Sequence, residues 1–231
     1  MKKEITYAFK QTIPVLLGYL FLGIAYGLLL EKAGFGPIWA FATSLIIYAG
    51  SMQFILVAFL TEGVSLLHAA ITTLFVNGRH IFYGLSFIQP FKKMGKKYPY
   101  MVFSLTDETY SVLCSLKVPK GIQENKVSFL ISLFDHGYWV IGSTLGGIIG
   151  EFISFDTTGI DFSMTALFVV IVVNQWTEQK EHRPAIIGLL AALGCLFLLG
   201  ADNFLLPAFC VAAVTLSFWK VPEKTESKGN R

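Results

Sequence analysis

A polar interruption, Tyr48-Ala49-Gly50-Ser51-Met52-Gln53, lies inside one of the most apolar stretches of the chain. A helix that breaks at glycine and serine frees backbone N–H and C=O groups, which a membrane tolerates only where they face protein or a water-filled cavity. The half-helix that resumes after the break begins with a partial positive charge suited to a carboxylate. We therefore predict that substrate is bound by Tyr48, Gly50, Ser51 and Gln53. A simple helix kink is the alternative.

A second polar group, Asn77-Gly78-Arg79-His80, is followed closely by Tyr83. Arg79 is the only arginine before residue 183. If 64–90 is one helix, Arg79 lies at membrane depth, where it must pair or face water, and His80 can carry protons near neutral pH. We predict that a gate or proton-linked element is formed by Asn77, Arg79, His80 and Tyr83. The alternative places Arg79 at the cytoplasmic interface, with its charge reaching the lipid headgroups.

Two neighbouring carboxylates, Asp107 and Glu108, interrupt the apolar stretch 100–116. Such a pair can bind an ammonium group or accept a coupling proton, and it can also pair with Arg79. We predict a binding or pairing role, against the alternative of a solvent-exposed loop. Three further polar pairs are predicted to be interfacial: Asp135-His136, Asn174-Gln175 and Asp202-Asn203.

Enzyme chemistry finds no support in the sequence. The chain lacks the H-E-x-x-H and G-x-S-x-G motifs, the P-loop and the Rossmann glycine fingerprint. Its four histidines and three cysteines have no metal-ligand or redox spacing. We expect no enzyme activity, no metal and no cofactor.

The elements that position these groups are apolar segments of membrane length. The chain is 54% hydrophobic and only 14% charged, and no charged residue occurs in 11–30 or 33–61. A membrane-spanning helix needs about 20 apolar residues, so we predict an all-α, multi-pass protein in a lipid bilayer. The first segment is too long for a signal peptide and lacks a small-residue cleavage site. The expected membrane segments are 12–30, 38–60, 64–90, 100–116, 127–150, 163–177, 184–200 and 203–219.

Lysines cluster near the N-terminus, in 92–97, in 117–126 and in the C-terminal tail, whereas 151–161 is acidic. The positive-inside rule places both termini and 117–126 in the cytoplasm, and it indicates membrane orientation rather than nucleic-acid binding as the purpose of the net charge of +3. Eight simple crossings would leave 92–97 outside. The conflict disappears if the second segment is re-entrant and 100–116 does not cross, so six to eight segments remain open.

An internal repeat is indicated by Gly18-Tyr19, Gly23 and Gly27, which recur 119 residues later as Gly137-Tyr138, Gly142 and Gly146. Transporters are often built from two such halves with the substrate site between them. We predict one transporter domain, 1–220, with repeat halves 1–118 and 125–220 and a polar cytoplasmic tail, 221–231. The Gly-x-x-x-Gly spacing predicts close helix packing.

The stretches Tyr48–Phe54, Asn77–Gly84, Thr106–Glu108, Asp161–Phe168 and Asn174–Trp176 together resemble the AzlC family. This resemblance implies the large subunit of a bacterial branched-chain amino acid permease, which acts with a small AzlD-type membrane subunit. Where the family often has Leu and Ala or Ser, this chain has Gly78 and Met52, which leaves the substrate range open.

The combined expectation is a permease of the bacterial cytoplasmic membrane that exports apolar amino acids, driven by the proton gradient. Gly50, Ser51 and Gln53 would hold the substrate carboxylate, and Asp107 or Glu108 would meet its ammonium group. The alternatives are a passive channel or importer on the same scaffold and a membrane subunit that transports nothing.

Overall fold

The computed structural model describes residues 2–152, 181–200 and 204–218, with scattered residues between 162 and 177. Within these residues the chain forms ten α-helices and no strand, which confirms the expected all-α class. The chain divides into two compact units, Met1–Phe168 and Val169–Arg231. The first unit contains α1 (Lys2–Lys32), α2 (Pro37–Ile46), α3 (Gly50–Glu62), α4 (Leu66–Asn77), α5 (Arg79–Lys92), α6 (Tyr98–Phe103), α7 (Asp107–Ser115) and α8 (Glu124–Phe152). The second contains α10 (Arg183–Leu199) and α11 (Leu205–Ser217), which pack against each other.

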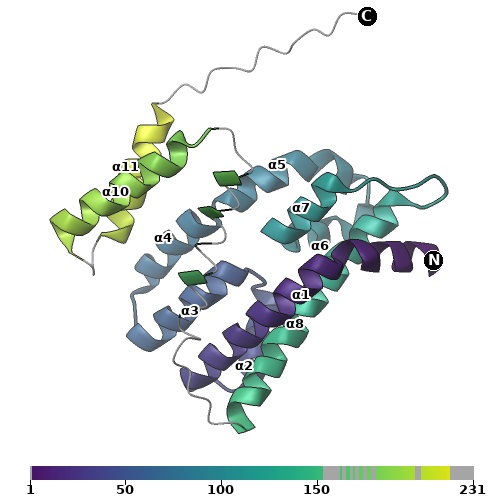
Figure 1. Cartoon of the computed structure of the whole chain (residues 1–231), viewed down its shortest axis with the longest axis horizontal. Coiled ribbons are helices and arrows are strands. Elements are labelled where there is room, and N and C mark those ends of the chain that lie inside the picture. Colours follow the sequence, from purple (N-terminus) through teal and green to yellow (C-terminus); the bar gives the residue numbers. More distant parts are fainter. Residues whose placement is uncertain are drawn as a thin grey trace, which may run out of the picture. The chain divides into compact units, whose positions relative to one another are not determined.

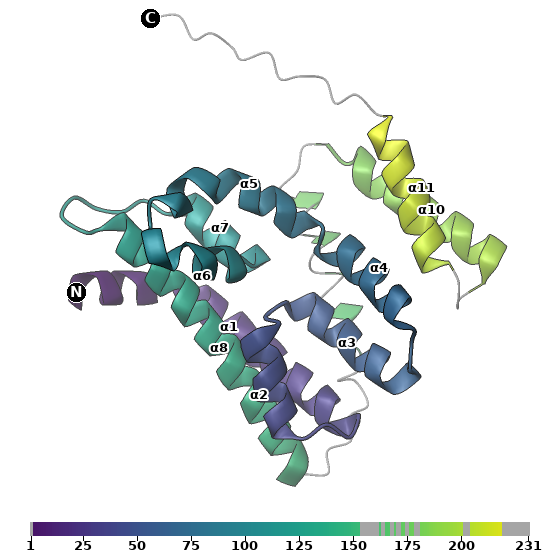
Figure 2. The ribbon, with the colours of Figure 1, turned by 180° about the vertical axis from the view of Figure 1, so that it is seen from behind.

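Helices α1 and α8 lie side by side along their length and run in the same direction (Figures 1 and 2). Ala8 packs in one cluster with Val127 and Ile131 near the start of both helices. Near their far ends, Gly150 lies against Glu31. This parallel pair is the frame on which the rest of the first unit is arranged.

Close approach of the two helices depends on the repeated glycines. A Cβ added to Gly23 would lie 2.9 Å from the backbone nitrogen of Ser143, and one added to Gly142 would lie 2.9 Å from the carbonyl oxygen of Tyr19. Gly27 and Gly146 are also each in contact with the backbone of the opposite helix. Small residues permit such contact where lipid provides no hydrophobic drive for association, so the packing role predicted for these glycines is confirmed.

Helices α2 and α3 form a V-shaped pair, here called the first hairpin. Pro37, at the start of α2, lies against Gly147, whereas the carbonyl oxygen of Ser44 accepts a bond from His136, about three turns of α8 closer to its beginning. The chain then turns at residues 47–49, and α3 runs back toward the side on which α2 began (Figure 2). The break predicted within 38–60 is therefore present, with its tip near the middle of α8.

Helices α6 and α7 form a second V-shaped pair, here called the second hairpin, which enters from the opposite end. Lys97, just before α6, sits 4.0 Å above the ring of Phe129, and Phe103 at its end lies against His136. Helix α7 returns, so that the carbonyl of Lys117 accepts a bond of 2.8 Å from the hydroxyl of Tyr7. The segment expected as one span at 100–116 is thus two short helices that begin and end on the same side.

The expected span 64–90 is also divided, because α4 ends at Asn77 and α5 begins at Arg79. These two helices continue one another in direction through the first unit (Figure 2). The break lies level with the tips of both hairpins, since Arg79 contacts residues of α3 and α7.

One end of the first unit gathers the lysine-rich segments. Phe91 and Met94, which flank Lys92 and Lys93, pack in the same cluster as Ala8 and Val127. The segment 92–97 therefore lies at the end where α1 and α8 begin, beside the 117–126 loop. This geometry contradicts eight simple crossings, which would have put 92–97 at the other end.

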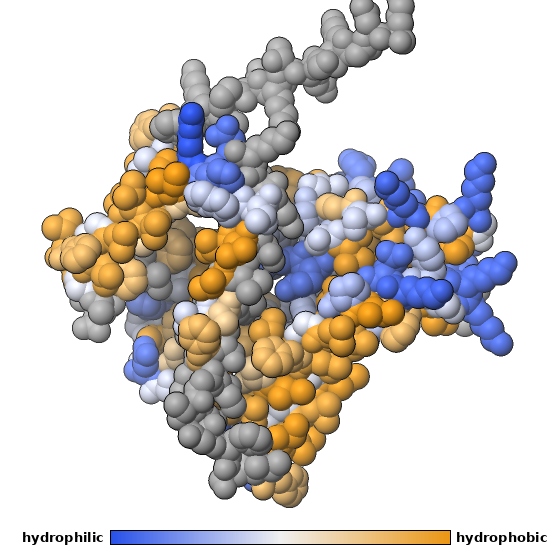
Figure 3. Space-filling model, in the orientation of Figure 1, coloured by the Kyte–Doolittle hydropathy of each residue, from blue (hydrophilic) through white to orange (hydrophobic). Residues whose placement is uncertain are grey.

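The outer surface of α1 carries an exposed apolar stripe. Leu17 and Phe21, one turn apart, have exposed fractions of 67% and 71%. Figure 3 shows apolar residues along this side of the first unit and hydrophilic ones gathered at the lysine-rich end. By length and composition α1 can cross a membrane, and the shorter apolar helices among the described residues are α2, α3, α4, α10 and the part of α11 from Pro207 to Ser217. Large exposed apolar surface of this kind is typical of contact with lipid.

Candidate functional site

Arg79 is the centre of the predicted polar groups. Its Nε donates to Oδ1 of Asp107 at 2.9 Å, and its Nη2 lies 2.7 Å from Oδ2 of the same carboxylate. Nη2 also donates to Oγ of Ser51 at 2.9 Å. Arg79, of the second predicted group, thus joins Ser51 of the first group to Asp107 of the third. This geometry supports an ion pair of Arg79 with Asp107 over a position of Arg79 at the lipid headgroups.

Three helices begin at this ion pair: α3 at Gly50, α5 at Arg79 and α7 at Asp107. Their sequences explain why they start there, because Gly50 follows a break and Gly78 separates α4 from α5. Thr106 caps α7 by accepting a hydrogen bond from the backbone N–H of Thr109. Helix N-termini carry partial positive charge and unpaired N–H groups. Three such N-termini beside Arg79 add N–H donors to those of the guanidinium at the middle of the first unit, opposite the carboxylate of Asp107.

Arg79 keeps donor capacity after it has bound Asp107 and Ser51. The guanidinium has five N–H groups in a planar fork, and Nη1 donates to no partner among the described residues. The side chains of Arg79 and Asp107 are 23% and 29% exposed, so the pair is accessible from outside. A second carboxylate could therefore bind to the free edge of the same guanidinium.

Gln53 holds the tip of the first hairpin rather than facing the ion pair. Its Oε1 accepts bonds from the backbone N–H of Ala49 at 3.2 Å and from Nε1 of Trp139 at 2.9 Å. Its Nε2 donates to Ser44 at 3.1 Å, and the side chain is fully buried. These bonds satisfy the polar groups that the helix break exposes, so Gln53 positions the site.

Tyr48 occupies a backbone conformation that bulky residues rarely adopt, with φ of 44°. Its ring stacks on His136 with 4.3 Å between centroids, and the side chain is only 3% exposed. The buried hydroxyl has no hydrogen-bond partner among the described residues. Gly50, two residues later, lies beside Trp139, whose ring would be in ordinary contact, at 3.4 Å, with an added Cβ. A strained residue with an unpaired polar atom is typical of functional sites.

The other predicted residues lie around the break between α4 and α5. Nδ1 of His80 lies 3.0 Å from the carbonyl oxygen of Asn77, whose own side-chain oxygen Oδ1 is buried without a described partner. Tyr83 stacks on Tyr110 of α7, with 4.4 Å between centroids. The His80–Asn77 contact thus lies at the break itself, and Tyr83, one turn beyond Arg79, joins α5 to α7.

Glu108 and Asp107 have different surroundings although they are adjacent. Asp107 pairs with Arg79, whereas Oε2 of Glu108 accepts a bond of 2.7 Å from the hydroxyl of Tyr19 on α1. Glu108 is therefore the carboxyl at this site that has no cation among its hydrogen-bonding partners in the described structure.

Sequence reasoning missed the polar face of α8. The expectation that Asp135-His136 is interfacial is wrong, because these side chains are 0% and 7% exposed in the middle of the unit. With Ser132, Trp139 and Ser143 they recur every three or four residues along α8, which puts them on one face. That spacing could have identified the face from the sequence.

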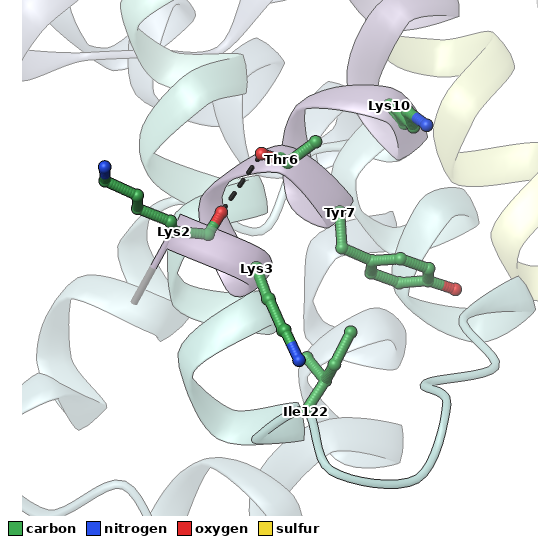
Figure 4. A pocket seen from close by; sticks show the side chains of 6 residues that line it. All are labelled: Lys2, Lys3, Thr6, Tyr7, Lys10 and Ile122. Atoms are coloured by element: carbon green, nitrogen blue, oxygen red, sulfur yellow. Dashed lines mark hydrogen bonds between the residues drawn. The ribbon is translucent and has the colours of Figure 1, made fainter.

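No group of three or more His, Cys, Asp or Glu able to hold a metal occurs in the part of the chain that the structure describes. A depression of about 380 Å³ lies apart from the ion pair, at the beginning of α1 (Figure 4). In the close-up, Lys3 extends toward Ile122 and Thr6 donates to the carbonyl of Lys2 at 3.0 Å. It belongs to the basic end of the unit and contains none of the predicted site residues. Asn174-Gln175 and Asp202-Asn203 lie outside the described residues.

Comparisons with known proteins identify relatives over nearly the whole chain. Residues 14–153 match the family model described as AzlC protein. The chain is 40% identical over 220 residues to the branched-chain amino acid transport protein AzlC of Bacillus subtilis, covering 95% of this chain and 87% of that one. It is also 40% identical to an uncharacterized membrane protein of Helicobacter pylori (92% and 93% covered) and 27% identical to inner membrane protein YgaZ of Escherichia coli (91% and 90% covered). No solved structure matches it.

Proposed function

Because the chain belongs to the AzlC family of membrane transport proteins, and is not an enzyme, we propose that it is a permease that exports branched-chain and other apolar amino acids. The family is the one that the motifs indicated. The name of the Bacillus subtilis relative supports the substrate class, and the site supports a zwitterion as ligand.

The observation that carries the proposal is the half-used guanidinium of Arg79 at the meeting point of three helix N-termini. The substrate carboxylate binds Nη1 of Arg79 and the N-terminal turn of α3 at Gly50 and Ser51. Asp107 holds the guanidinium in place through two bonds, so it is not the group that meets the substrate ammonium. That role falls to Glu108, which has no cation among its described bonding partners.

Tyr48 borders the same site, with its unpaired hydroxyl available to the substrate. Gln53 belongs to the site as the residue that fixes the hairpin tip. Asn77, His80 and Tyr83 form the gate, because they lie at the break where α5 can pivot against α4 and α7.

The topology that fits this site has six crossings. In the first unit these are α1, the α4–α5 pair and α8, while the two hairpins re-enter from opposite sides. The segments expected from the sequence at 163–177, 184–200 and 203–219 would then return the C-terminus to the starting side. All lysine-rich segments are cytoplasmic and 151–161 is outside, as the positive-inside rule requires. The name of the Escherichia coli relative supports the inner membrane as the location.

The proton gradient drives export, since the chain has no nucleotide-binding motif and the site contains titratable groups. A small AzlD-type membrane subunit completes the transporter, and the exposed apolar faces of the first unit offer it a docking surface as well as contact with lipid. The tail 221–231 stays a predicted cytoplasmic segment outside the described residues.

Inverted membrane vesicles from cells that express the chain with its small subunit provide the test. We expect labelled leucine and valine to accumulate when the vesicle interior is acidified, and a protonophore to abolish the accumulation. Equilibration without accumulation would indicate a passive channel. Equal uptake in vesicles that lack both subunits would refute transport by this protein.

A further inference from the structure

A continuous chain of hydroxyl groups connects two carboxyls, Glu108 of α7 and Asp135 of α8. Oη of Tyr19 lies 2.7 Å from Oε2 of Glu108 and 2.8 Å from Oγ1 of Thr106. Oγ1 of Thr106 lies 3.1 Å from Oγ1 of Thr109, which in turn lies 2.9 Å from Oδ2 of Asp135. Glu108 is partly exposed at the ion pair, whereas Asp135 and Thr109 are fully buried. This series of hydroxyl groups therefore leads from the edge of the proposed substrate site into the core.

The hydrogens available to this series of hydrogen-bonded oxygens can be counted. Four oxygen–oxygen contacts of hydrogen-bonding length need four hydrogens, but the three hydroxyls of Tyr19, Thr106 and Thr109 supply only three. The backbone N–H of Thr109 bonds to Thr106 and fills none of the four contacts. Ionised carboxylates accept hydrogen bonds and donate none. With both carboxyls ionised, one pair of oxygens would face each other without a hydrogen, whereas one added proton completes every contact.

The surroundings of Asp135, at the buried end of these hydroxyls, also favour one added proton. Oδ1 of Asp135 makes no hydrogen bond with any described residue. An ionised Asp135 would thus be a charge in the core that a single hydroxyl stabilises, which is costly. A proton that resides at Asp135 for part of the cycle removes this charge.

We propose that Glu108 and Asp135 share one proton, which passes between them through Tyr19, Thr106 and Thr109 and sets the charge of Glu108. With the proton on Glu108, every hydroxyl donates toward Asp135. Transfer breaks the O–H bonds of Glu108 and of the three hydroxyls, and it forms four new ones that end on Oδ2 of Asp135. All hydroxyls then donate toward Glu108, which is left as a carboxylate.

This inference rests on the proposed function and assigns its coupling step. An ionised Glu108 attracts the ammonium group of an amino acid, and a protonated Glu108 releases it, so the position of one proton decides whether the substrate is held. Other titratable or charged groups face the two ends of the chain of hydroxyls. They are Tyr48, Tyr100 and His136 near Asp135, and Arg79, Asp107 and Tyr83 near Glu108.

Infrared spectroscopy of the purified full chain at neutral pH tests the shared proton without any substrate. The wild type should show the C=O stretching band of a carboxylic acid. Asp135→Asn should abolish the band, because its amide N–H supplies the fourth hydrogen and leaves Glu108 ionised. Glu108→Gln should keep a band at the frequency of Asp135 alone, because the Gln amide oxygen accepts from Tyr19 and the proton stays on Asp135. The exposed Glu62→Gln variant is the control and should keep the wild-type band. Absence of the band in the wild type, its survival in Asp135→Asn, or an unchanged band in Glu108→Gln would overturn the proposal.

Transport measurements on Thr109→Val and Thr109→Ser test the coupling role. Every release of leucine, in exchange as in net transport, requires the proton to reach Glu108, so Thr109→Val should lose at least about 10-fold of both leucine exchange and gradient-driven accumulation. Thr109→Ser restores the hydroxyl and should retain both. Normal accumulation by Thr109→Val would overturn the relay alone. Failure of the wild type to exchange leucine or valine would instead overturn the proposed function, and the coupling role with it.

Discussion

At the scale of single residues, Arg79 performs two tasks with one planar group, since it binds Asp107 through two atoms and leaves Nη1 for a ligand. Lysine carries the same charge but not the fork. Arg79→Lys should lower leucine transport about 10- to 100-fold, the equivalent of about 1.5–3 kcal/mol for a lost charged hydrogen bond. Arg183→Lys, at a 61% exposed side chain, is the matched control. Equal transport by both variants would exclude Arg79 from the site.

A substitution at Tyr48 can distinguish a role in binding from a role in stability, because its hydroxyl is buried without a described partner. Tyr48→Phe removes no hydrogen bond within the described structure and keeps the ring stacked on His136. Thermal unfolding in detergent should therefore be unchanged or slightly raised, while leucine transport falls through a higher KM. A lower unfolding temperature with unchanged KM would assign the hydroxyl a structural role instead.

The types of the charged residues predicted these contacts correctly, whereas predictions made from the adjacent residue in the sequence did not. A lone arginine and a pair of carboxylates at membrane depth indicated an ion pair, because an unpaired charge there is costly. The different tasks of Asp107 and Glu108 could not be predicted, since they depend on which side of α7 faces Arg79 and which faces Tyr19. Asp135 was misplaced because it was judged from its adjacent histidine and not from the face of α8 that it shares with Trp139.

At the scale of helices, the packing of α1 against α8 requires glycine at one position of α1 and not at another. Gly23→Ala would bring its Cβ to 2.9 Å from backbone nitrogen, so it should cost about 1–3 kcal/mol of stability. Gly18→Ala in the same helix meets nothing within 4 Å and should stabilise by about 0.5–1 kcal/mol. Unfolding in detergent measures both. Similar effects of the two substitutions would contradict this packing.

The break between α2 and α3 is stabilised because Gln53 forms hydrogen bonds with polar groups around it. Gln53→Ala leaves the half-buried N–H of Ala49 and the buried N–H of Trp139 without their acceptor. Each such group costs about 1–3 kcal/mol, so a loss of at least about 2 kcal/mol is expected in the same unfolding assay. Gln89→Ala on α5 is the control, since Gln89 is exposed. The two substitutions should differ clearly, and matching effects would show that Gln53 does not support the tip.

The sequence located the break at Tyr48–Ser51, because glycine and serine interrupt an apolar run there. It did not show that the chain reverses at the tip, since reversal depends on the left-handed backbone of Tyr48 and on the contacts of Gln53 with α8. The short helices α6 and α7 were likewise hidden, because the residues between them, Ser104-Leu105-Thr106, contain neither glycine nor proline.

At the scale of the whole molecule, composition alone indicated a membrane protein, and lysine distribution predicted its orientation. Cysteines introduced at Lys3, Lys93 and Lys120 should all react with a membrane-impermeant thiol reagent from the cytoplasmic side, in a chain whose own cysteines are replaced. Thr61→Cys, at the far end of α3, should react from the opposite side. Labelling of Lys93→Cys from the outer side would restore the model of eight simple crossings.

The packing of α1 against α8 indicates how the two halves of the repeat proposed from the sequence would be oriented relative to each other. Gly23 and Gly27 of α1 face Gly142 and Gly146 of α8, which are their counterparts in the repeat, and the two helices run the same way. Halves related in this manner would share an axis along the membrane normal rather than within its plane. The counterpart of Gln53, Gln175, lies outside the described residues.

The two hairpins have one electrical consequence. Each hairpin reaches only to the middle of α8 from its own side, so wherever water follows a hairpin inward, the insulating barrier between the two aqueous phases narrows to the side chains around the tips. A transmembrane voltage of 100 mV, worth about 2.3 kcal/mol for each elementary charge, would then fall across a few side chains near Arg79. A charge displaced over a short distance there would experience most of that voltage, so transport should respond steeply to the membrane potential.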